Sequence, residues 1–461
     1  MTMKNMTLGN IAKACGGTFI GTQQEEGIEV SGISIDSRTI QTGGLFVATR
    51  GARTDGHLYI DDVIGKGAAA VVSEQDLGSV SYPYIRVEDS FDALKKMAAF
   101  YRIGLDIKVV GITGSVGKTS TKEMIASVLS TKYQVQKTDK NFNNEVGLPL
   151  TIFTIGEEHE VAVLEMGISD FGEMTRLAQI AKPDICVITN IGQCHLENLK
   201  TRDGVLKAKT EIFTGMSEDG EAVLCGDDDK LLTVQSVNGR PAHYFTRLQK
   251  ENAEVYASGI VSRGLFGSDC TIHTRQGSFD VHIPLLGEHM VSNALAAATV
   301  GLLLGLSLPQ IREGIEKVKA LPGRSRVVET GQYVVIDDCY NANPVSMRAA
   351  LDVLMLAEGR RVAVIGSMFE LGQEQERLHD EIGAYAAAKG IDVIVALGEL
   401  GRHIYEGAKA AGQKQLFYYE NAEEFLKHKG EILQAGDTIL VKASHGMHLE
   451  RIVEELEEAG K

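Results

Sequence analysis

Residues 107–124 read IKVVGITGSVGKTSTKEM and predict a buried strand, a tight glycine-rich turn and the start of a helix. The first part is an apolar run with the β-branched residues Val109, Val110 and Ile112, which favours a strand. Gly114 and Gly117 then free the backbone to curl, so that successive N–H groups can point at one anion. The stretch therefore predicts an α/β domain built around this strand.

The turn has the chemistry of a nucleotide-phosphate site. Lys118 supplies a positive charge, Thr119 offers a hydroxyl to Mg²⁺, and the following helix presents its positive N-terminal end. The general pattern has its first glycine five residues before the Gly-Lys pair, where this chain has Ile112. The alternative is a strand-turn-helix that merely uses glycine. We expect the phosphates of a nucleotide to contact Gly114, Ser115, Val116, Gly117, Lys118, Thr119 and Ser120.

Composition excludes several classes of protein. A formal net charge of −16 argues against a general nucleic-acid or acidic-membrane surface. The six cysteines are scattered without a CxxC pair, which is typical of reduced thiols. No apolar run approaches the length of a membrane span, and the N-terminal stretch lacks the apolar core of a signal peptide. We expect a cytoplasmic protein that neither inserts into membranes nor binds nucleic acid.

Three α/β domains are predicted, at residues 1–105, 106–321 and 322–461. The first is a small unit closed by a helix over Ser90–Tyr101, with Ser90 as its expected cap. The second carries the phosphate loop on a parallel sheet, because Lys108–Thr113, Val161–Met166 and Ile185–Ile191 are near-continuous apolar runs. Its residues 221–286 are expected to be more irregular, with short strands near Glu221–Leu224, Cys270–His273 and Val281–Pro284. The third is a Rossmann-like domain with strands at Tyr333–Asp337, Arg361–Ile365, Ile391–Leu397 and Thr438–Lys442.

Three titratable residues follow the apolar runs of the second domain. Glu165 ends a strand, from which its carboxylate can reach a metal beside Thr119; a surface acid is the alternative. His195 lies in a loop expected above the same edge of the sheet, or serves a structural role. Lys209 shares the apolar face of a predicted helix, so its amine either extends to solvent or works with a lowered pKa. Such an amine can add CO₂ and become a carbamate that ligates Mg²⁺.

Other polar segments are weaker candidates. Residues 138–149, TDKNFNNEVGLP, hold Asn141, Asn143 and Asn144, which resist helix and strand and form either a plain loop or a ligand surface. Arg324 and Asp338 of the third domain could contact phosphate and ribose. Polar turns of the first domain are either a second phosphate-ligand site or solvated hairpins, and they hold Asp36, Ser37, Arg38 and His57.

Taken together, these segments resemble the Mur ligase family, ATP-dependent amide-forming enzymes of peptidoglycan precursor synthesis. The phosphate loop and TDKNFNNEVGLP are similar to the family's motifs. They are followed in the family's order by EMG, ITNIGQCHLE, KAKTEIF, GEHMVSNALAAA, LPGRSR and DDCYNANP, so that the likeness spans all three domains.

The resemblance implies roles for the candidate residues. Lys118, Lys209 and His195 would take part in catalysis, with Lys209 carbamylated. Two Mg²⁺ ions would be held by Thr119, Glu165, His195 and Lys209. Asn293 would contact adenine, Asp338 ribose and Arg324 phosphate. The uridine nucleotide substrate would be bound by Asp36, Ser37, Arg38, His57, Asn143 and Asn144.

The resemblance also implies substrates. GARTDGHLYI (residues 51–60), DDCYNANPVSM and GSMFELG (residues 366–372) resemble the branch that joins D-alanyl-D-alanine to UDP-N-acetylmuramoyl-tripeptide through an acyl phosphate, as a monomer. The sequence differs from the family pattern at Met290, Ala443 and His445, where Asn, Gly and Arg are usual. The alternatives are a sister ligase that adds the third amino acid, a folylpolyglutamate-synthase-like ligase, and a P-loop ATPase that uses hydrolysis for motion.

Overall fold

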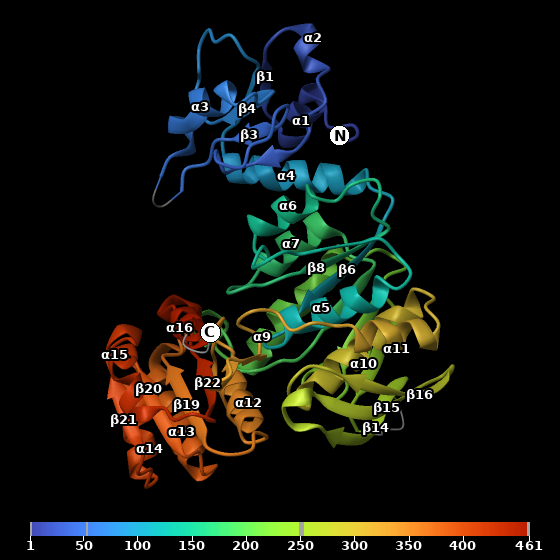
Figure 1. Ribbon diagram of the computed structural model, residues 1–461. Helices are drawn as coiled ribbons and strands as arrows, with labels where there is room; N and C mark the ends of the chain where they lie inside the picture. Colours follow the sequence, from blue (N-terminus) through green and yellow to red (C-terminus); the bar gives the residue numbers. More distant parts are fainter. Residues whose placement is uncertain (1, 52–53, 249–252, 459–461) are drawn as a thin grey trace.

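The computed structural model describes residues 2–51, 54–248 and 253–458; Ala52 and Arg53 of the GARTDGHLYI segment lie outside these ranges. Three large sheets stand apart along the molecule, each covered by helices (Figure 1). Each falls within one of the three predicted ranges, whose end residues stay a prediction. No helix of the described ranges has the length and apolarity that a membrane span requires.

The first sheet has five strands in the order β1-β5-β4-β3-β2, with β1 antiparallel to β5 and the others parallel. The helix predicted to close this domain is present, but its cap is Asp89 and not Ser90. Asp89 is extended and accepts a hydrogen bond from the Asp92 N–H at 2.8 Å, whereas Ser90 is buried and donates to the Ala48 carbonyl. The elements are α1 (Leu8–Cys15), β1 (Thr18–Ile20), α2 (Gln23–Glu26), β2 (Ile33–Ser34), β3 (Leu45–Val47), α3 (Ile60–Gly65), β4 (Ala70–Ser73), β5 (Tyr84–Arg86) and α4 (Ser90–Ile103).

The second sheet has nine strands in the order β16-β15-β14-β13-β10-β9-β6-β8-β7. The strands from β14 to β7 are parallel, and β15 is antiparallel to both of its neighbours, β14 and β16. The region predicted to be irregular extends the central sheet: its three predicted short strands are β10, β15 and β16, and β13 and β14 are additional. Its strands are β6 (Lys108–Thr113), β7 (Val135–Lys137), β8 (Val161–Glu165), β9 (Ile185–Ile188), β10 (Glu221–Cys225), β13 (His243–Thr246), β14 (Val255–Ser262), β15 (Ser268–Thr274) and β16 (Gly277–Ile283). Its helices are α5 (Lys118–Leu129), α6 (Gly147–Ile152), α7 (Glu173–Ala181), α8 (Leu196–Leu199), α9 (Arg202–Thr210), α10 (His289–Leu303) and α11 (Leu308–Glu316).

The third sheet has six strands in the order β17-β18-β22-β19-β20-β21, all parallel except β17. Its four predicted strands are present, and the edge strands β17 and β21 are additional. The elements are β17 (Arg326–Glu329), β18 (Val334–Asp337), α12 (Pro344–Leu354), β19 (Arg361–Gly366), α13 (Gln375–Ala388), β20 (Val393–Leu397), α14 (Gly401–Ala410), β21 (Leu416–Tyr419), α15 (Ala422–Ile432), β22 (Thr438–Lys442) and α16 (Glu450–Glu458).

Helix α4 joins the first two domains into one packed body. It lies between the first sheet and helices α6 and α7 of the second domain (Figure 1). The Tyr101 hydroxyl donates to the Ile155 carbonyl at 2.6 Å, and the Arg102 guanidinium donates to the carbonyls of Ala181 and Lys182 at the end of α7. One apolar core contains buried side chains of both domains, so this boundary is a packed interface and not a free linker.

The contact between the second and third domains is smaller. Leu286, which precedes α10, is buried in an apolar cluster with Val353 and Leu354 of α12. Polar contacts cross this boundary at the phosphate loop, between Arg324 and Thr119, and at the start of α8, between His195 and Glu370.

Candidate active site

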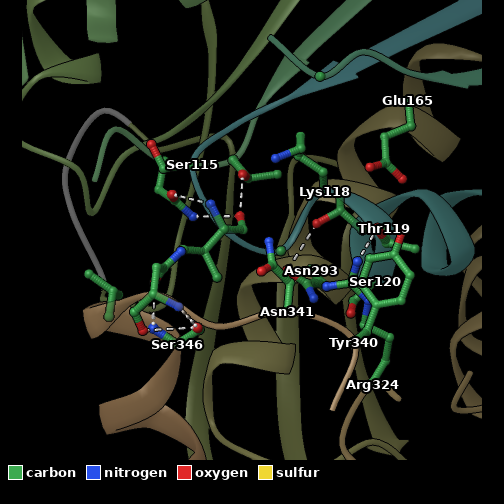
Figure 2. Close-up of a pocket in the computed structure, with 18 of the residues that line it drawn as sticks. Ser115, Lys118, Thr119, Ser120, Glu165, Asn293, Arg324, Tyr340, Asn341 and Ser346 are labelled. Carbon is green, nitrogen blue, oxygen red and sulfur yellow. Dashed lines mark hydrogen bonds between the residues drawn. The ribbon is translucent and has the colours of Figure 1, made fainter. Parts of the chain in front are cut away.

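A cavity of about 890 Å³ lies between the second and third domains (Figure 2). Its described lining residues fall between Ser115 and Lys442, and they include the phosphate loop, the Asn-rich segment and the loops after β18 and β19. It thus lies beyond the carboxyl ends of parallel strands, where α/β sheets bind ligands.

The phosphate loop wraps tightly against the end of β9. Gly114 has φ 155°, and a Cβ there would come within 1.9 Å of the Thr189 hydroxyl oxygen. The Val116 N–H donates to the Asn190 side chain at 3.0 Å, and the Thr189 hydroxyl donates to the Val116 carbonyl at 2.7 Å. Only glycine fits at position 114, so the curl of the loop is built into the fold.

The cavity face of the loop is formed by Ser115–Ser120, six of the seven loop residues predicted to contact the nucleotide phosphates. Gly117 is left-handed, with φ 82°, and α5 begins directly after it. The Lys118 amine lies back over the loop and donates to the Gly114 carbonyl at 2.9 Å. A bound phosphate would meet this amine and the free N–H groups at the start of α5.

Glu165 is buried at the end of β8 and lines the cavity. One carboxylate oxygen, Oε1, accepts a hydrogen bond from the Asn143 amide at 2.8 Å, and the other, Oε2, is buried without a partner among the described residues. Figure 2 shows the carboxylate directed toward the start of α5, near Lys118 and Thr119. An unpartnered buried carboxylate oxygen fits a cation as its missing partner, so these residues fit a Mg²⁺ ion beside Thr119.

Lys209 lies on α9 and is almost completely buried. Burial, with the positive charge of Lys118, lowers the pKa of its amine to about 7. The neutral amine, which is the form that adds CO₂, is therefore well populated at neutral pH. Lys209 is not among the described residues that line the cavity, so a carbamate there would have to reach the cavity past the wall.

His195 lies on the cavity wall at the start of α8, with a left-handed backbone of φ 50°. Its Nδ1 atom is 3.1 Å from Oε2 of Glu370, which comes from the loop after β19 in the third domain. The hydrogen bond to His195 holds the pKa of the Glu370 carboxyl below its usual value. The imidazole is thus engaged by a carboxylate across the domain boundary, a contact that sequence reasoning missed.

No group of three or more His, Cys, Asp or Glu side chains suited to a metal occurs in the described ranges. The predicted metal set of Thr119, Glu165, His195 and Lys209 therefore stays a prediction. Mg²⁺ commonly takes one or two carboxylates and completes its shell with phosphate oxygens and water, so Glu165 with Thr119 remains a sufficient protein contribution.

The predicted nucleotide contacts of the third domain also line the cavity, but much of their polar capacity is already used. Asp338 accepts from the Lys442 amine at 2.6 Å through Oδ2 and from the Ser325 N–H at 2.9 Å through Oδ1. In α10, the Asn293 oxygen accepts from the Thr121 hydroxyl at 3.0 Å, and its amide nitrogen donates to the sulfur of Met290 at 3.2 Å. Adenine and ribose contacts by these two residues stay predictions.

The residues predicted to hold the uridine nucleotide are divided between two places. Asn143 and Asn144 line the cavity. Asp36, Ser37, Arg38 and His57 belong to the first domain and are not among the described lining residues. Both ring nitrogens of His57 are engaged, one with Asp55 at 2.6 Å and the other with the Glu74 N–H at 3.1 Å. This geometry favours a structural role for His57.

Comparison with protein families accounts for most of the chain. The model of the Mur ligase middle domain matches residues 112–301, that of the Mur ligase glutamate ligase domain matches 323–445, and that of the Mur ligase family catalytic domain matches 29–102. A protein of Bacillus subtilis named UDP-N-acetylmuramoyl-tripeptide–D-alanyl-D-alanine ligase is 37% identical over 463 residues, which cover 99% of both chains. This chain belongs to the Mur ligase family.

Other relatives agree with this assignment. An Escherichia coli ligase of the same name is 35% identical to this Mur ligase and covers 99% of the chain, with 100% of its own length matched. A crystal structure of MurF from Acinetobacter baumannii superposes with a TM-score of 0.90 at 31% identity, covering 99% of this chain and 100% of that one. MurF of Thermotoga maritima in complex with ADP has a TM-score of 0.81 at 29% identity and covers 93% and 97%. The predicted family and three-domain α/β fold are confirmed.

Proposed function

We propose that this Mur ligase joins D-alanyl-D-alanine to the free carboxylate of UDP-N-acetylmuramoyl-tripeptide with ATP as the energy source. The observation that carries the proposal is the cavity between the second and third domains, where the phosphate loop, Glu165 and Arg324 meet. The full-length similarity to ligases of that name supports the choice of substrates.

The chain's own groups suit phosphoryl transfer followed by amide formation. The substrate carboxylate attacks the γ-phosphorus of ATP, and ADP leaves; the dipeptide amine then attacks the acyl carbon, loses a proton and expels phosphate. Lys118 and the N-terminus of α5 attract the phosphates, and Arg324 approaches them from the third domain. Mg²⁺, when bound at Glu165 and Thr119, would neutralise charge on the phosphate oxygens.

The domains divide the work in this proposal. The first would hold the uridine nucleotide, with Asp36, Ser37 and Arg38 as the candidate contacts. The second would bind ATP and two Mg²⁺ ions, with Lys209 as a carbamate. The third would hold the dipeptide and part of ATP. Closing the domains before chemistry would protect the acyl phosphate from water. The enzyme would act as a monomer in the cytoplasm.

Phosphate release tests the proposal directly. The purified chain is supplied with ATP, Mg²⁺, UDP-N-acetylmuramoyl-tripeptide and D-alanyl-D-alanine, and each of the two peptide substrates is omitted in turn. Sustained release should require both of them. Release with neither peptide substrate would indicate an ATPase, and release only with a UDP-dipeptide and a free amino acid would indicate a sister ligase.

A further inference from the structure

Arg324 is fixed in place through its backbone neighbours. The Gly323 N–H donates to Oδ2 of Asp337 at 2.8 Å, and the Ser325 N–H donates to Oδ1 of Asp338 at 2.9 Å. Lys442, itself buried, pairs with the remaining oxygen of Asp338. Asp337 and Asp338, at the end of β18, thus hold the residues before and after Arg324. The turn cannot shift without breaking these hydrogen bonds.

The side chain of Arg324 is held by a ring. Its guanidinium carbon lies 3.9 Å from the centre of the Tyr340 ring, which is close for a cation–π contact. From there Nη2 comes within 3.3 Å of the Thr119 hydroxyl on the phosphate loop (Figure 2). The Tyr340 N–H donates to the Gly323 carbonyl at 3.1 Å, so the ring and the turn are joined.

The ring of Tyr340 has a second partner in the same domain. His445 stacks on it, with ring centres 5.4 Å apart and planes inclined by 28°. A ring packed in this way has fewer orientations available, and so does the guanidinium that it supports.

This arrangement leaves the charge of Arg324 available. The guanidinium has five N–H donors; one on Nη2 contacts the Thr119 hydroxyl, and further donors can reach phosphate oxygens. In the described ranges no carboxylate lies within ion-pair distance of Arg324, so its positive charge is not neutralised by protein. A carboxylate in the place of Tyr340 would orient the same side chain but cancel its charge.

We propose that Tyr340 is a positioning residue whose ring, supported by His445, holds the guanidinium of Arg324 at the phosphate loop, so that the third domain delivers this charge to the nucleotide. The inference rests on the proposed function, because it takes the phosphates of ATP as the group that Arg324 meets. Tyr340 acts through Arg324 and has no direct part in the chemistry.

The test compares kcat and KM for ATP in Tyr340→Leu and Tyr340→Phe. The Leu variant should lose about tenfold in kcat, the rate equivalent of one partly desolvated cation–π contact, with a smaller change in KM because the charge matters most in the transition state. The Phe variant keeps the ring and should recover most of the lost rate. A Leu variant with the wild-type kcat, or a Phe variant as slow as Leu, overturns the inference.

A double-variant cycle separates positioning from stability. If Tyr340 acts through Arg324, then Tyr340→Leu causes no further loss of kcat in an Arg324→Ala background. Equal losses in both backgrounds would mean a general structural defect and would overturn the inference. His445→Ala, on an exposed residue, should reproduce a small part of the Leu effect and His445→Phe should restore it; a wild-type kcat for His445→Ala would remove His445 from the proposal. A wild type without acceptor-dependent phosphate release would instead overturn the proposed function, and the inference with it.

Discussion

The Lys209 amine is buried, and burial disfavours its charged form. Its burial and the charge of Lys118 lower its pKa to about 7, so that both the neutral and charged forms are present near neutral pH. Among the described residues no carboxylate pairs with the Lys209 amine, and a carbamate there would carry the charge opposite to that of Lys118. The lowered pKa and the burial of Lys209 therefore support the proposal that its amine is carbamylated.

Replacing Lys209 with Ala should reduce kcat at least about a hundredfold, since a ligand to the metal would be lost. Short carboxylic acids added to the assay should restore part of the activity by occupying the vacated space. The exposed Lys207 of the same helix gives the matched control, because Lys207→Ala removes a charge without reaching the site. A Lys209→Ala enzyme with normal phosphate release would rule the carbamate out.

The buried imidazole of His379 should make the stability of the fold depend on pH. It is fully buried in the third domain, where Nδ1 donates to the Gln375 carbonyl and Nε2 accepts from the Met368 N–H at 2.8 Å. Burial lowers its pKa below the usual 6.5. Below that pH the unfolded chain binds the extra proton more readily than the folded one, so stability falls as the solution is acidified.

The change to test is His379→Gln. The variant should be less stable than the wild type at pH 8, and it should lose less free energy of unfolding between pH 7 and pH 5, because it has no imidazole to protonate. Urea unfolding monitored by fluorescence or circular dichroism at several pH values gives both quantities. If the free energy of unfolding fell equally in the two proteins between pH 7 and pH 5, His379 would not contribute to the pH dependence.

At the scale of elements, the decisive unit is β6, the phosphate loop and α5, and Gly114→Ala tests its geometry. A Cβ at this position would clash with Thr189, and the backbone angle disfavours any side chain. We expect kcat to fall by about a hundredfold or more through the displaced loop. The double variant Gly114→Ala/Thr189→Ala removes the steric clash and should recover part of that loss; no recovery would mean that backbone strain alone decides.

Sequence reasoning succeeded with elements whose signal is local. Strands β8 and β9 are buried throughout, and β6 and β19 are buried after their first residue, so their continuous apolar runs made them predictable. β14 was missed because its buried residues alternate with half-exposed ones and its pairing is interrupted by a bulge. The Asp89 cap was missed by one residue because Asp and Ser are equally good caps and only the extended backbone distinguishes them.

In the site, too, residues close in the sequence were predictable and contacts between distant residues were not. The loop residues were predictable because their chemistry lies within one short stretch. The contact of Arg324 with Thr119 joins residues 205 positions apart, and the pair of His195 with Glu370 joins two domains. Neither residue type nor spacing in the sequence carries this information, because it depends on how the third sheet is placed against the second.

At the scale of the whole molecule, the His195–Glu370 pair connects the second and third domains across the cavity. The Glu370 side chain is 66% exposed, so salt screens the pair and its worth is small. We expect Glu370→Gln to lower kcat by about twofold at low ionic strength through weaker closure of the domains. The difference from the wild type should vanish as salt is added to the assay; a difference that persists at high salt would assign Glu370 a role other than closure.

The packing of α4 between the first two domains restricts how these domains can be exchanged between related proteins. Because Tyr101 and Arg102 bond to carbonyls of the second domain, a first domain exchanged between relatives must bring a matching surface on α6 and α7 with it. The portion of the chain that can be recombined as a module is therefore the first two domains together, and properties of the first domain should evolve by point substitution and not by its exchange alone.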